Sequence, residues 1–292
     1  MNKVIEQMLQ SFAPKSLEER KNAMKEVMQE IALCGLSRAG FFDKAVFYGG
    51  TALRIFHELD RFSEDLDFSL RDPDPDFRLQ RFLPILEREV QSFGVHMTVQ
   101  QKEKSMVSNI QTAFLKGDTR EHLLHYFPDI ATASGTAASE RIQIKLEIDI
   151  NPPGFATFEH RYQLMPLPYA IALYDKPSLF AGKIHAVLCR GWKNRVKGRD
   201  LYDYVHFLSR STPFNLEHLR ERLMQSGAIQ DRDSFTVNEA KKLLYQHFTT
   251  VNYDQARDDV LPFISNPAML DLWNADFFTQ ITQLLKPAEN RY

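Results

Sequence analysis

The sequence predicts an α+β fold, in which a mixed α/β half with flanking helices precedes an all-helical C-terminal half. Three observations support this: a regular apolar–polar alternation over 142–150, a short apolar run over 45–48, and helical spacing of apolar residues beyond position 176. We therefore expect two domains. The first, 1–175, holds N-terminal helices and the α/β domain, and the second, 176–292, is helical.

Composition excludes several classes of protein. The chain has 292 residues, of which 43% are hydrophobic and 25% charged, as in ordinary globular proteins. The net charge of -2 means that any basic surface for nucleic acid has to be local. Two cysteines far apart exclude a disulfide scaffold and favour a reducing, cytoplasmic location. No run of about 18 apolar residues occurs, so we expect no contact with a membrane.

The first predicted elements are a helix, a strand and a second helix. Ser16 and Glu19 have the spacing of a capping box, which predicts a helix that begins after Ser16. The apolar run 45–48 predicts a buried strand that ends at the glycine pair 49–50, and residues 51–58 have helical periodicity.

A second strand is expected over 63–70, because Leu66, Phe68 and Leu70 alternate with polar residues. The rest of the first half is predicted from periodicity and turn residues. We expect a turn at 71–76, a helix at 78–93, strands near 95–99 and 107–115, an exposed loop at 131–139, and strands at 142–150 and 169–173.

The second half has the periodicity of helices throughout. One apolar stripe follows Phe180, Ile184 and Val187, and another follows Leu201 and Tyr204. Further helices are expected near 215–227, 236–250 and 268–285.

The segment Gly49-Gly50-Thr51 lies between a predicted strand and a predicted helix. Glycines let a backbone approach a ligand closely, and the N–H groups at a helix N-terminus bind anions. Thr51 adds a hydroxyl. Taken alone, the pattern is more often an ordinary turn.

Asp65 and Asp67 stand two positions apart on a predicted strand, so both carboxylates project from one face. Like charges on one face repel each other, and hard oxygen ligands at this spacing suit Mg²⁺. The alternative is a solvated polar face of the strand. The order of the two motifs, a glycine turn followed by Asp-x-Asp, favours neighbouring phosphate and metal sites.

The strand predicted at 142–150 carries two further acids, Glu147 and Asp149, on one face. A third carboxylate beside Asp-x-Asp completes the kind of two-metal site that holds the attacking and leaving oxygens of a phosphate. The alternative is an ordinary charged exterior, with Lys145 as a neighbour.

The helical half contains a run of basic residues that ends at two acids. The run consists of Lys183, Arg190, Lys193, Arg195, Lys197 and Arg199, and the acids are Asp200 and Asp203. Such charges favour binding of a polyphosphate. The alternatives are a solvated loop and an ion pair between Arg199 and Asp203, which are four positions apart on one helix.

Together these segments resemble the AbiEii/AbiGii toxin family of nucleotidyltransferases. The resemblance rests on four ordered blocks, which are residues 47–54 with 61–68, 145–153, 179–183 and 195–203. It implies a minimal nucleotidyltransferase fold of the DNA polymerase β type, joined to a helical domain. It also implies Mg²⁺ or Mn²⁺ as the cofactor and a nucleoside triphosphate (NTP) as the substrate.

The resemblance also implies roles for individual residues. Gly49, Gly50 and Thr51 would hold the triphosphate, together with Lys183 and Arg199. Asp65 and Asp67 would hold the metal. Both Glu147 and Asp149 fit the third acidic position of the family, so the choice between them stays open. Lys183 and either Asp200 or Asp203 would complete the catalytic site from the helical half.

Members of the family act as toxins of toxin–antitoxin or abortive-infection systems. The resemblance thus implies transfer of a nucleoside monophosphate to an acceptor such as tRNA, and an antitoxin regulator that acts without a stable complex. Two other functions remain open at this point. One is a non-catalytic nucleotide-binding module, which the intact Asp-x-Asp disfavours, and the other is a metal-dependent phosphodiesterase or nuclease, which the glycine turn disfavours.

Overall fold

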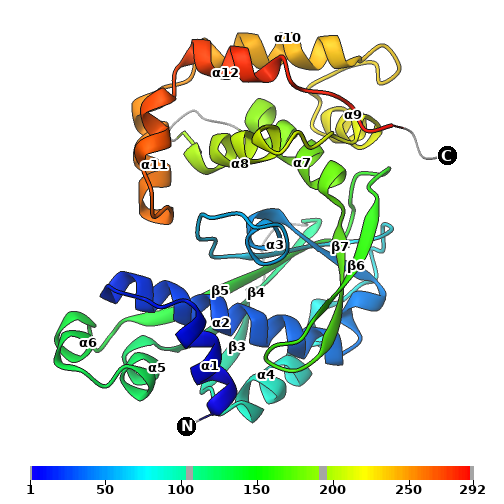
Figure 1. Cartoon of the computed structure of the whole chain (residues 1–292). Helices are drawn as coiled ribbons and strands as arrows, with labels where there is room; N and C mark the ends of the chain where they lie inside the picture. Colours follow the sequence, from blue (N-terminus) through cyan, green and yellow to red (C-terminus); the bar gives the residue numbers. More distant parts are fainter. Residues whose placement is uncertain (1, 103–107, 191–195, 290–292) are drawn as a thin grey trace. The chain divides into compact units, whose positions relative to one another are not determined.

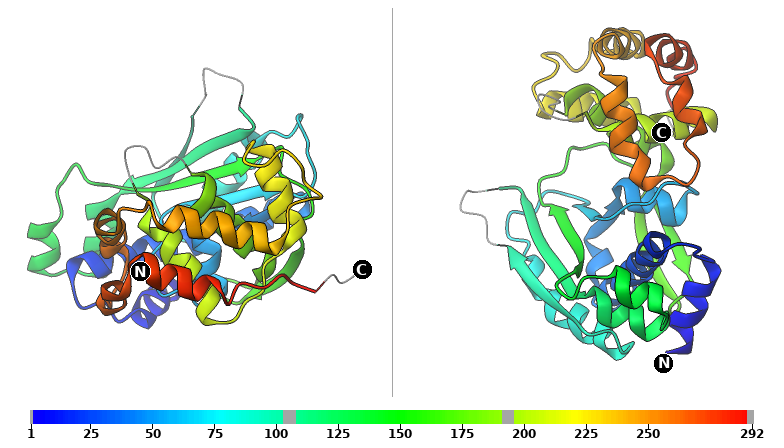
Figure 2. Two further views of the ribbon diagram at one scale, coloured as in Figure 1. Left: turned by 90° about the horizontal axis from the view of Figure 1, so that it is seen from above. Right: turned by 90° about the vertical axis from the view of Figure 1, so that its left-hand side faces the viewer.

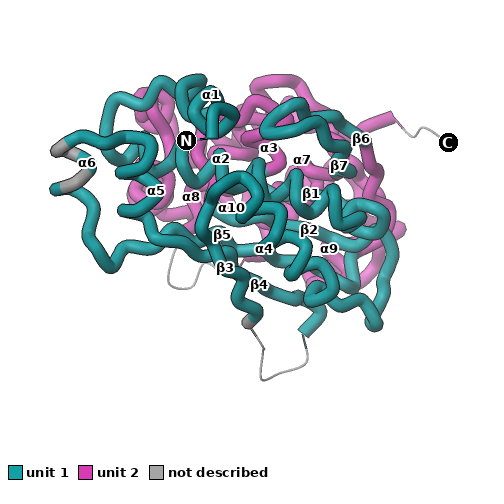
Figure 3. Tube along the Cα trace, turned by 90° about the horizontal axis from the view of Figure 1, so that it is seen from below, with its two compact units in different colours: residues 1–51, 64–152, 160–173 teal, residues 52–63, 153–159, 174–292 magenta. Residues whose placement is uncertain are grey.

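The computed structural model describes residues 2–102, 108–190 and 196–289, and the chain divides into two compact units (Figure 3). Unit 1 comprises Met1–Thr51, Glu64–Pro152 and His160–Leu173. Unit 2 comprises Ala52–Ser63, Pro153–Glu159 and Tyr174–Tyr292. Unit 2 therefore contains two short segments from the first half of the chain in addition to the helical half.

Two helices open unit 1. They are α1 (Lys3–Ser11) and the 22-residue α2 (Leu17–Arg38). The prediction that a helix begins after Ser16 is confirmed, because the Ser16 hydroxyl accepts a hydrogen bond from the Glu19 N–H at 3.1 Å. This bond occupies one of the N–H groups that every helix N-terminus leaves unpaired.

Seven strands form one mixed sheet (Figure 1). The strands are β1 (Ala45–Tyr48), β2 (Leu66–Leu70), β3 (Met97–Lys102), β4 (Ile110–Asp118), β5 (Arg141–Asp149), β6 (Phe158–Gln163) and β7 (Tyr169–Tyr174). Their order is β3-β4-β5-β2-β1-β7-β6. The pairs β1–β7 and β2–β5 are parallel, whereas β1–β2, β3–β4 and β4–β5 are antiparallel. The predicted α+β class is therefore confirmed.

The alternation in β2 and β5 separates a buried face from an acidic one. Leu66, Phe68 and Leu70 are buried, and so are the apolar residues of β5. A period of two places alternate side chains on opposite faces of a strand, so the predicted core face is confirmed. Strand β2 begins at Leu66 rather than at residue 63, which leaves Asp65 directly before the strand.

Helices pack against the sheet within unit 1. Helix α2 contacts both β5 and α4 (Leu83–Ser92), and α4 contacts β3. The helix predicted at 78–93 is divided into the 3-10 turn η2 (Leu79–Arg81) and α4. Pro84 stands in the first turn of α4, where its missing N–H costs no hydrogen bond.

The core of this layer is aromatic. The short turn η1 (Phe41–Asp43) places the centre of the Phe41 ring 4.9 Å from that of Phe68 on β2. The ring of Phe47, on the neighbouring strand β1, lies 5.2 Å from the Phe68 ring. Large rings at these distances fix the positions of β1 and β2, the two strands that flank the predicted site.

Two helices follow β4 in a region where the sequence gives no apolar period. They are α5 (Thr119–Tyr126) and α6 (Ile130–Gly135). The expectation of a loop over 131–139 is therefore wrong for its first residues. Asp129 caps α6 by accepting a hydrogen bond from the Thr132 N–H at 2.8 Å, and this local bond starts a short helix among small residues. The edge strand β6 was also missed, because four of its six residues are charged or polar.

Unit 2 is helical. It contains α7 (Lys176–Cys189), α8 (Gly198–Ser209), α9 (Leu216–Gln225), α10 (Val237–Phe248), α11 (Tyr253–Val260), η3 (Leu261–Phe263), η4 (Ala268–Leu272) and α12 (Ala275–Thr282). Helices α10 and α12 lie side by side in Figures 1 and 2, and α7 packs against α8 and α9. The stacked rings of Phe180 and Phe207, 4.6 Å apart, join α7 to α8.

Helix α3 (Gly49–Phe56) follows β1 directly and passes from unit 1 to unit 2 after Thr51. Among the described helices, none is both long enough and apolar enough to cross a membrane.

Candidate active site

The turn between β1 and α3 brings the backbone against an aspartate. Gly49 has a φ of +86°, a conformation that residues with a Cβ rarely adopt. A Cβ built at Gly49 would lie 2.4 Å from Oδ2 of Asp67, which is the cross-strand partner of Tyr48. Only glycine therefore lets the Asp67 carboxylate lie directly over the first turn of α3.

Thr51 and Gly50 are buried in the first turn of α3. The Thr51 hydroxyl donates a hydrogen bond of 2.5 Å to the backbone carbonyl of Asp65. This bond attaches α3 to Asp65, the residue that precedes β2. The binding of triphosphate by Gly49, Gly50 and Thr51 stays a prediction.

Strands β2 and β5 are adjacent and parallel, and their register aligns the acids. Asp67 lies opposite Glu147, and Ser69 lies opposite Asp149. Registered neighbours on adjacent strands share a face, so Asp67, Glu147 and Asp149 project from the same side of the sheet. Asp65 is exposed, whereas the other three acids are partly buried.

Glu147 and Asp149 differ in their surroundings. The Glu147 carboxylate lies 2.6 Å from the Lys145 ammonium and accepts a 3.3 Å hydrogen bond from Thr112 on β4. The Asp149 carboxylate accepts a hydrogen bond of 2.9 Å from the N–H of Asn151 in the following turn. Register thus makes Glu147, rather than Asp149, the neighbour of Asp67.

The acids fit a hard divalent cation in their chemistry. Mg²⁺ binds through one or two carboxylates and completes its shell with water and phosphate oxygens. Asp65 and Asp67 supply such carboxylates at the start of β2, and the Asp67 carboxylate lies against Gly49. Within the described part of the chain, no three acidic, histidine or cysteine side chains gather closely enough to form a metal site by themselves.

The predicted residues of unit 2 meet in a buried ion cluster. The Lys183 ammonium on α7 lies 2.6 Å from Oδ2 of Asp203 and 3.6 Å from Oδ1 of Asp200, both on α8. Arg61 binds the two oxygens of Asp203 through two N–H groups, at 2.6 and 2.7 Å. Arg190 pairs with Asp200 at 2.7 Å.

The cluster keeps the Asp203 carboxylate ionised. Burial alone would raise the pKa of Asp203, but the charges of Arg61 and Lys183 and their hydrogen bonds outweigh it and lower that pKa to about 2. Burial likewise opposes the charge of Arg61, and Asp203 nevertheless raises its pKa. Three cations face two carboxylates, so the cluster as a whole is positive.

The other basic residues of the run have different positions. Arg199 pairs with Asp259 at 3.6 Å, and its guanidinium lies 4.1 Å above the centre of the Phe263 ring. Asp203 binds Arg61 and Lys183 instead of forming the alternative ion pair with Arg199, which stands four positions earlier on the same helix. Lys193 and Arg195 lie outside the described residues.

Arg61 was missed as a site residue by the sequence reasoning. It is buried, and its partner Asp203 is 142 positions away in the chain. Its place directly before the Phe-Ser-Glu-Asp segment, within a block that resembles the family, was the available signal.

A mixed sheet with a glycine turn beside an Asp-x-Asp strand defines a nucleotidyltransferase type of fold. The model of a family described as nucleotidyl transferase AbiEii toxin, type IV TA system, matches residues 31–279. The chain belongs to this family of nucleotidyltransferase toxins. Membership implies an NTP substrate and an antitoxin partner.

The solved structure of one toxin shares the fold at low sequence identity, and a second structure is similar at a lower score. MenT4, a nucleotidyltransferase toxin from Mycobacterium tuberculosis H37Rv, is 17% identical with a TM-score of 0.56, over 99% of this chain and 90% of that one. JHP933 from Helicobacter pylori is 16% identical with a TM-score of 0.47, over 90% of each chain. A search of curated proteins gives no match.

Proposed function

We propose that the chain transfers a nucleoside monophosphate from an NTP to a hydroxyl group of an RNA acceptor, with Mg²⁺ as the cofactor. The proposal assigns the cation to Asp65 and Asp67 and places Glu147 beside them. The observation that carries it is the position of the Asp67 carboxylate over Gly49, in register with Glu147. One short segment would thus combine a turn that binds the phosphates with carboxylates that bind the cation.

The glycine turn would bind the triphosphate. Helix α3 begins at Gly49, and the unpaired N–H groups of its first turn attract anionic oxygens. Because Gly49 has no side chain, the Asp67 carboxylate lies against this backbone, and a cation on that carboxylate would be beside phosphates bound at the turn. A cation held by the two aspartates would neutralise the phosphate charge beside them.

The reaction is a substitution at the α-phosphorus. The acceptor hydroxyl forms a new P–O bond in line with the leaving group, and its proton passes to a carboxylate of the site. The bond between the α-phosphorus and the bridging oxygen breaks, and pyrophosphate leaves with the electron pair. Glu147, held by Lys145 and Thr112, is fixed in orientation for its place beside Asp67.

Lys183 is proposed as the phosphate ligand contributed by unit 2. The net positive charge of its cluster supports binding of an anion. Asp203 would act as a positioning residue, because its carboxylate holds the Lys183 ammonium at 2.6 Å. Asp200 and Arg199 are proposed to contribute to the net charge that this cluster presents to the anion.

The biological setting follows from the family. We propose that the activity is that of a toxin, that tRNA is an acceptor, and that the antitoxin regulates without a stable complex. Cytoplasmic location is proposed on the same basis.

The test is transfer of label. The chain is incubated with each α-labelled NTP, Mg²⁺ and total RNA, alongside Asp67→Asn and the control Asp72→Asn, which alters an exposed acid just beyond β2. We expect labelled RNA from the wild type and the control, and a loss of at least about 100-fold, or roughly 3 kcal/mol, for Asp67→Asn.

Three results would contradict the proposal. Full activity of Asp67→Asn would remove the metal role of that residue. Binding of NTP without transfer to any RNA would favour a non-catalytic nucleotide-binding module. Shortened RNA without incorporated label would favour a nuclease.

A further inference from the structure

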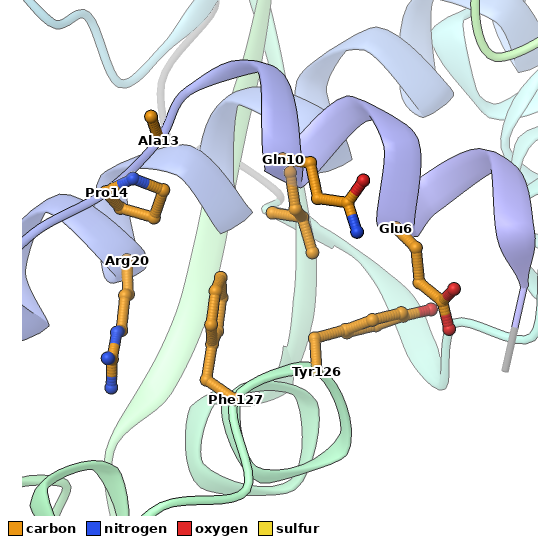
Figure 4. Close-up of a pocket in the computed structure, with 8 residues that line it drawn as sticks. Glu6, Gln10, Ala13, Pro14, Arg20, Tyr126 and Phe127 are labelled. Atoms are coloured by element: carbon orange, nitrogen blue, oxygen red, sulfur yellow. The ribbon is translucent and has the colours of Figure 1, made fainter.

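Unit 1 contains a pocket formed by its two N-terminal helices and α5, and none of the predicted site residues lines it. Its volume is about 430 Å³, within the range of sites for small ligands. Figure 4 shows the lining residues, which are Glu6, Leu9, Gln10, Ala13, Pro14, Arg20, Tyr126 and Phe127.

Among the described residues, three polar groups of this pocket have no hydrogen-bond partner. Within the described ranges, the carboxylate of Glu6, the amide of Gln10 and the hydroxyl of Tyr126 make no hydrogen bond with another residue. Figure 4 shows the Glu6 carboxylate near the hydroxyl end of the Tyr126 ring. Burial, with the Glu6 charge as a smaller cause, raises the pKa of Tyr126, so this hydroxyl remains a neutral hydrogen-bonding group.

The one cation of the lining is already neutralised. Arg20 donates to Asp129 at 2.5 Å and to Thr132 at 2.8 Å, and its guanidinium lies 5.2 Å from the centre of the Phe127 ring. The charge that remains without a partner in the pocket is the negative charge of Glu6. A phosphate group is therefore disfavoured, and a ligand with N–H donors is favoured.

The aromatic residues narrow the class of ligand further. Tyr126 and Phe127 are consecutive and half-buried. Figure 4 shows the Tyr126 ring beside the Glu6 carboxylate and the Phe127 ring between Tyr126 and Arg20. Aromatic surfaces that stack a base, combined with polar groups that read its edge, are how proteins recognise unpaired nucleotides. Guanine presents two adjacent donors, N1–H and the 2-amino group, which match the two oxygens of one carboxylate.

Helix α2 connects this pocket to the acids of the candidate site. Arg20 lines the pocket, and Lys25 lies five residues further along, or about 8 Å along the helix axis. The Lys25 ammonium lies 3.3 Å from the Glu64 carboxylate, and Glu64 directly precedes Asp65. Within this one unit, the pocket is thus a short distance from the proposed metal ligands, on the scale of a few nucleotides.

We propose that this pocket binds a guanine base of a single-stranded acceptor RNA near its reacting end. The base lies against Tyr126 and Phe127 and donates its N1–H and 2-amino hydrogens to Glu6. The inference rests on the proposed function only in naming RNA as the acceptor. Glu6 determines the preference for guanine, and the rings contribute stacking to whichever base is bound.

The first test measures RNA binding by the full chain. The probes are three fluorescein-labelled RNAs of twelve nucleotides, one of alternating A and G, one with inosine in place of each G, and one of A alone. Inosine lacks the 2-amino group and loses one donor to the carboxylate. We expect the wild type to bind the guanosine RNA at least fivefold more tightly than the inosine RNA, as measured by fluorescence anisotropy.

Two variants locate the effect. Glu6→Gln should bind the guanosine and inosine RNAs with affinities within about twofold of each other. Glu18→Gln, which removes an exposed carboxylate from α2 outside the pocket, should keep the wild-type preference. In a second test, RNA that carries 6-thioguanosine is irradiated, and we expect cross-links in peptide 121–141, which contains Tyr126 and Phe127.

The outcomes separate this proposal from the proposed function. Guanine preference that depends on Glu6, in a chain that labels no RNA, supports the pocket and removes the transfer reaction. An active chain whose RNA preference is the same in Glu6→Gln overturns the pocket alone. Cross-links confined to other peptides also overturn it. A further probe is an arginine-rich peptide. If Glu6→Gln loses binding to this peptide while its RNA binding is unchanged, the pocket is assigned to a protein partner and the proposal is overturned.

Discussion

Acids at two places in the chain were predicted to serve one reaction, and their surroundings differ. In unit 1, Asp65 is exposed and Asp67 is half-buried at the edge of a strand. In unit 2, the Asp203 side chain is 0% exposed and binds two cations at 2.6–2.7 Å. The first pair of acids lies where a soluble cation can reach it, and Asp203 has its counter-charges built into the fold.

This difference separates two uses of a carboxylate. Acids on one exposed face repel each other, and a bound cation relieves that repulsion. A buried carboxylate with fixed cations contributes to structure, and loss of either partner leaves a charge without compensation. The same substitution at the two places should therefore have opposite consequences.

The largest expected effect comes from replacing aspartate by asparagine at each place. Asp203→Asn should destabilise unit 2 by about 3–5 kcal/mol, because Arg61 and Lys183 keep buried charges. Asp67→Asn should leave the stability of unit 1 within about 0.5 kcal/mol, or raise it slightly. Urea unfolding followed by tryptophan fluorescence measures the stability of unit 2 in Asp203→Asn, since Trp192 and Trp273 both belong to the sequence of unit 2.

Hydrogen exchange of peptides from β2 measures the stability of unit 1 in Asp67→Asn. The comparison fails if Asp203→Asn unfolds at the urea concentration of the wild type, or if Asp67→Asn exposes β2 to rapid exchange.

The two units should also respond to acid in opposite directions. Burial and then the charge of Arg222 lower the pKa of His218 to about 3 and that of His185 to about 4. Between pH 6.5 and 5 these histidines take up protons in the unfolded state and stay neutral in the folded one. Unit 2 should lose about 2 kcal/mol for each histidine across that window.

In unit 1 the sign is reversed. Burial and then the charge of Glu26 raise the pKa of Glu30 to about 7, in spite of its hydrogen bond from Gln163. The folded state holds this proton between pH 7 and 4.5 and the unfolded state does not, so Glu30 should contribute about 2–3 kcal/mol to the stability of unit 1 in acid. His122 opposes this contribution, because burial lowers its pKa.

The stability of each unit is measured at pH 7 and at pH 5. Tryptophan fluorescence reports the unfolding of unit 2, and hydrogen exchange, corrected for the intrinsic exchange rate, reports that of unit 1. Glu30→Gln is the control, because it should remove the stabilising response of unit 1 to acid and leave the response of unit 2. Parallel loss of stability in both units at pH 5 would contradict this prediction.

Local patterns predicted the elements that the reasoning depended on. Leu66, Phe68 and Leu70 revealed the buried face of β2 because a period of two is a property of the strand alone. Ser16 and Glu19 marked the start of α2 for the same reason, since a capping box is complete within four residues.

Features that depend on distant partners could not be predicted this way. The sequence left Glu147 and Asp149 equal, and only the register of β5 against β2 places Glu147 beside Asp67. The bond between Arg61 and Asp203 joins residues in separate helical and loop segments, so no spacing rule identifies it. Lys183 belongs to a run of basic residues that suggests a solvated surface, yet its side chain is 14% exposed and ion-paired.

Lys183→Ala tests whether the cluster of unit 2 also has a function. We expect NTP binding to weaken by about 1.5–3 kcal/mol, or roughly 10- to 100-fold, and unit 2 to lose a similar amount of stability with the bond to Asp203. Calorimetric titration with a non-hydrolysable NTP analogue gives the first value. Lys176→Ala, an exposed lysine on the same helix, should change neither quantity. Unchanged affinity with lost stability would make Lys183 a partner of Asp203 and nothing more.

The smallest expected effect concerns Gly49. Alanine there would have to keep a φ of +86° and place its Cβ 2.4 Å from Asp67 Oδ2, so the carboxylate must move. We expect a stability loss of about 1–2 kcal/mol from the backbone strain, and a loss of transfer of about tenfold from the displaced carboxylate. Gly94→Ala separates the two causes, because Gly94 has a φ of +78° with open space where its Cβ would stand. That control should show the same loss of stability in hydrogen exchange and full transfer of label. If Gly49→Ala were as active as Gly94→Ala, the close approach of Asp67 to the turn would have no part in the reaction.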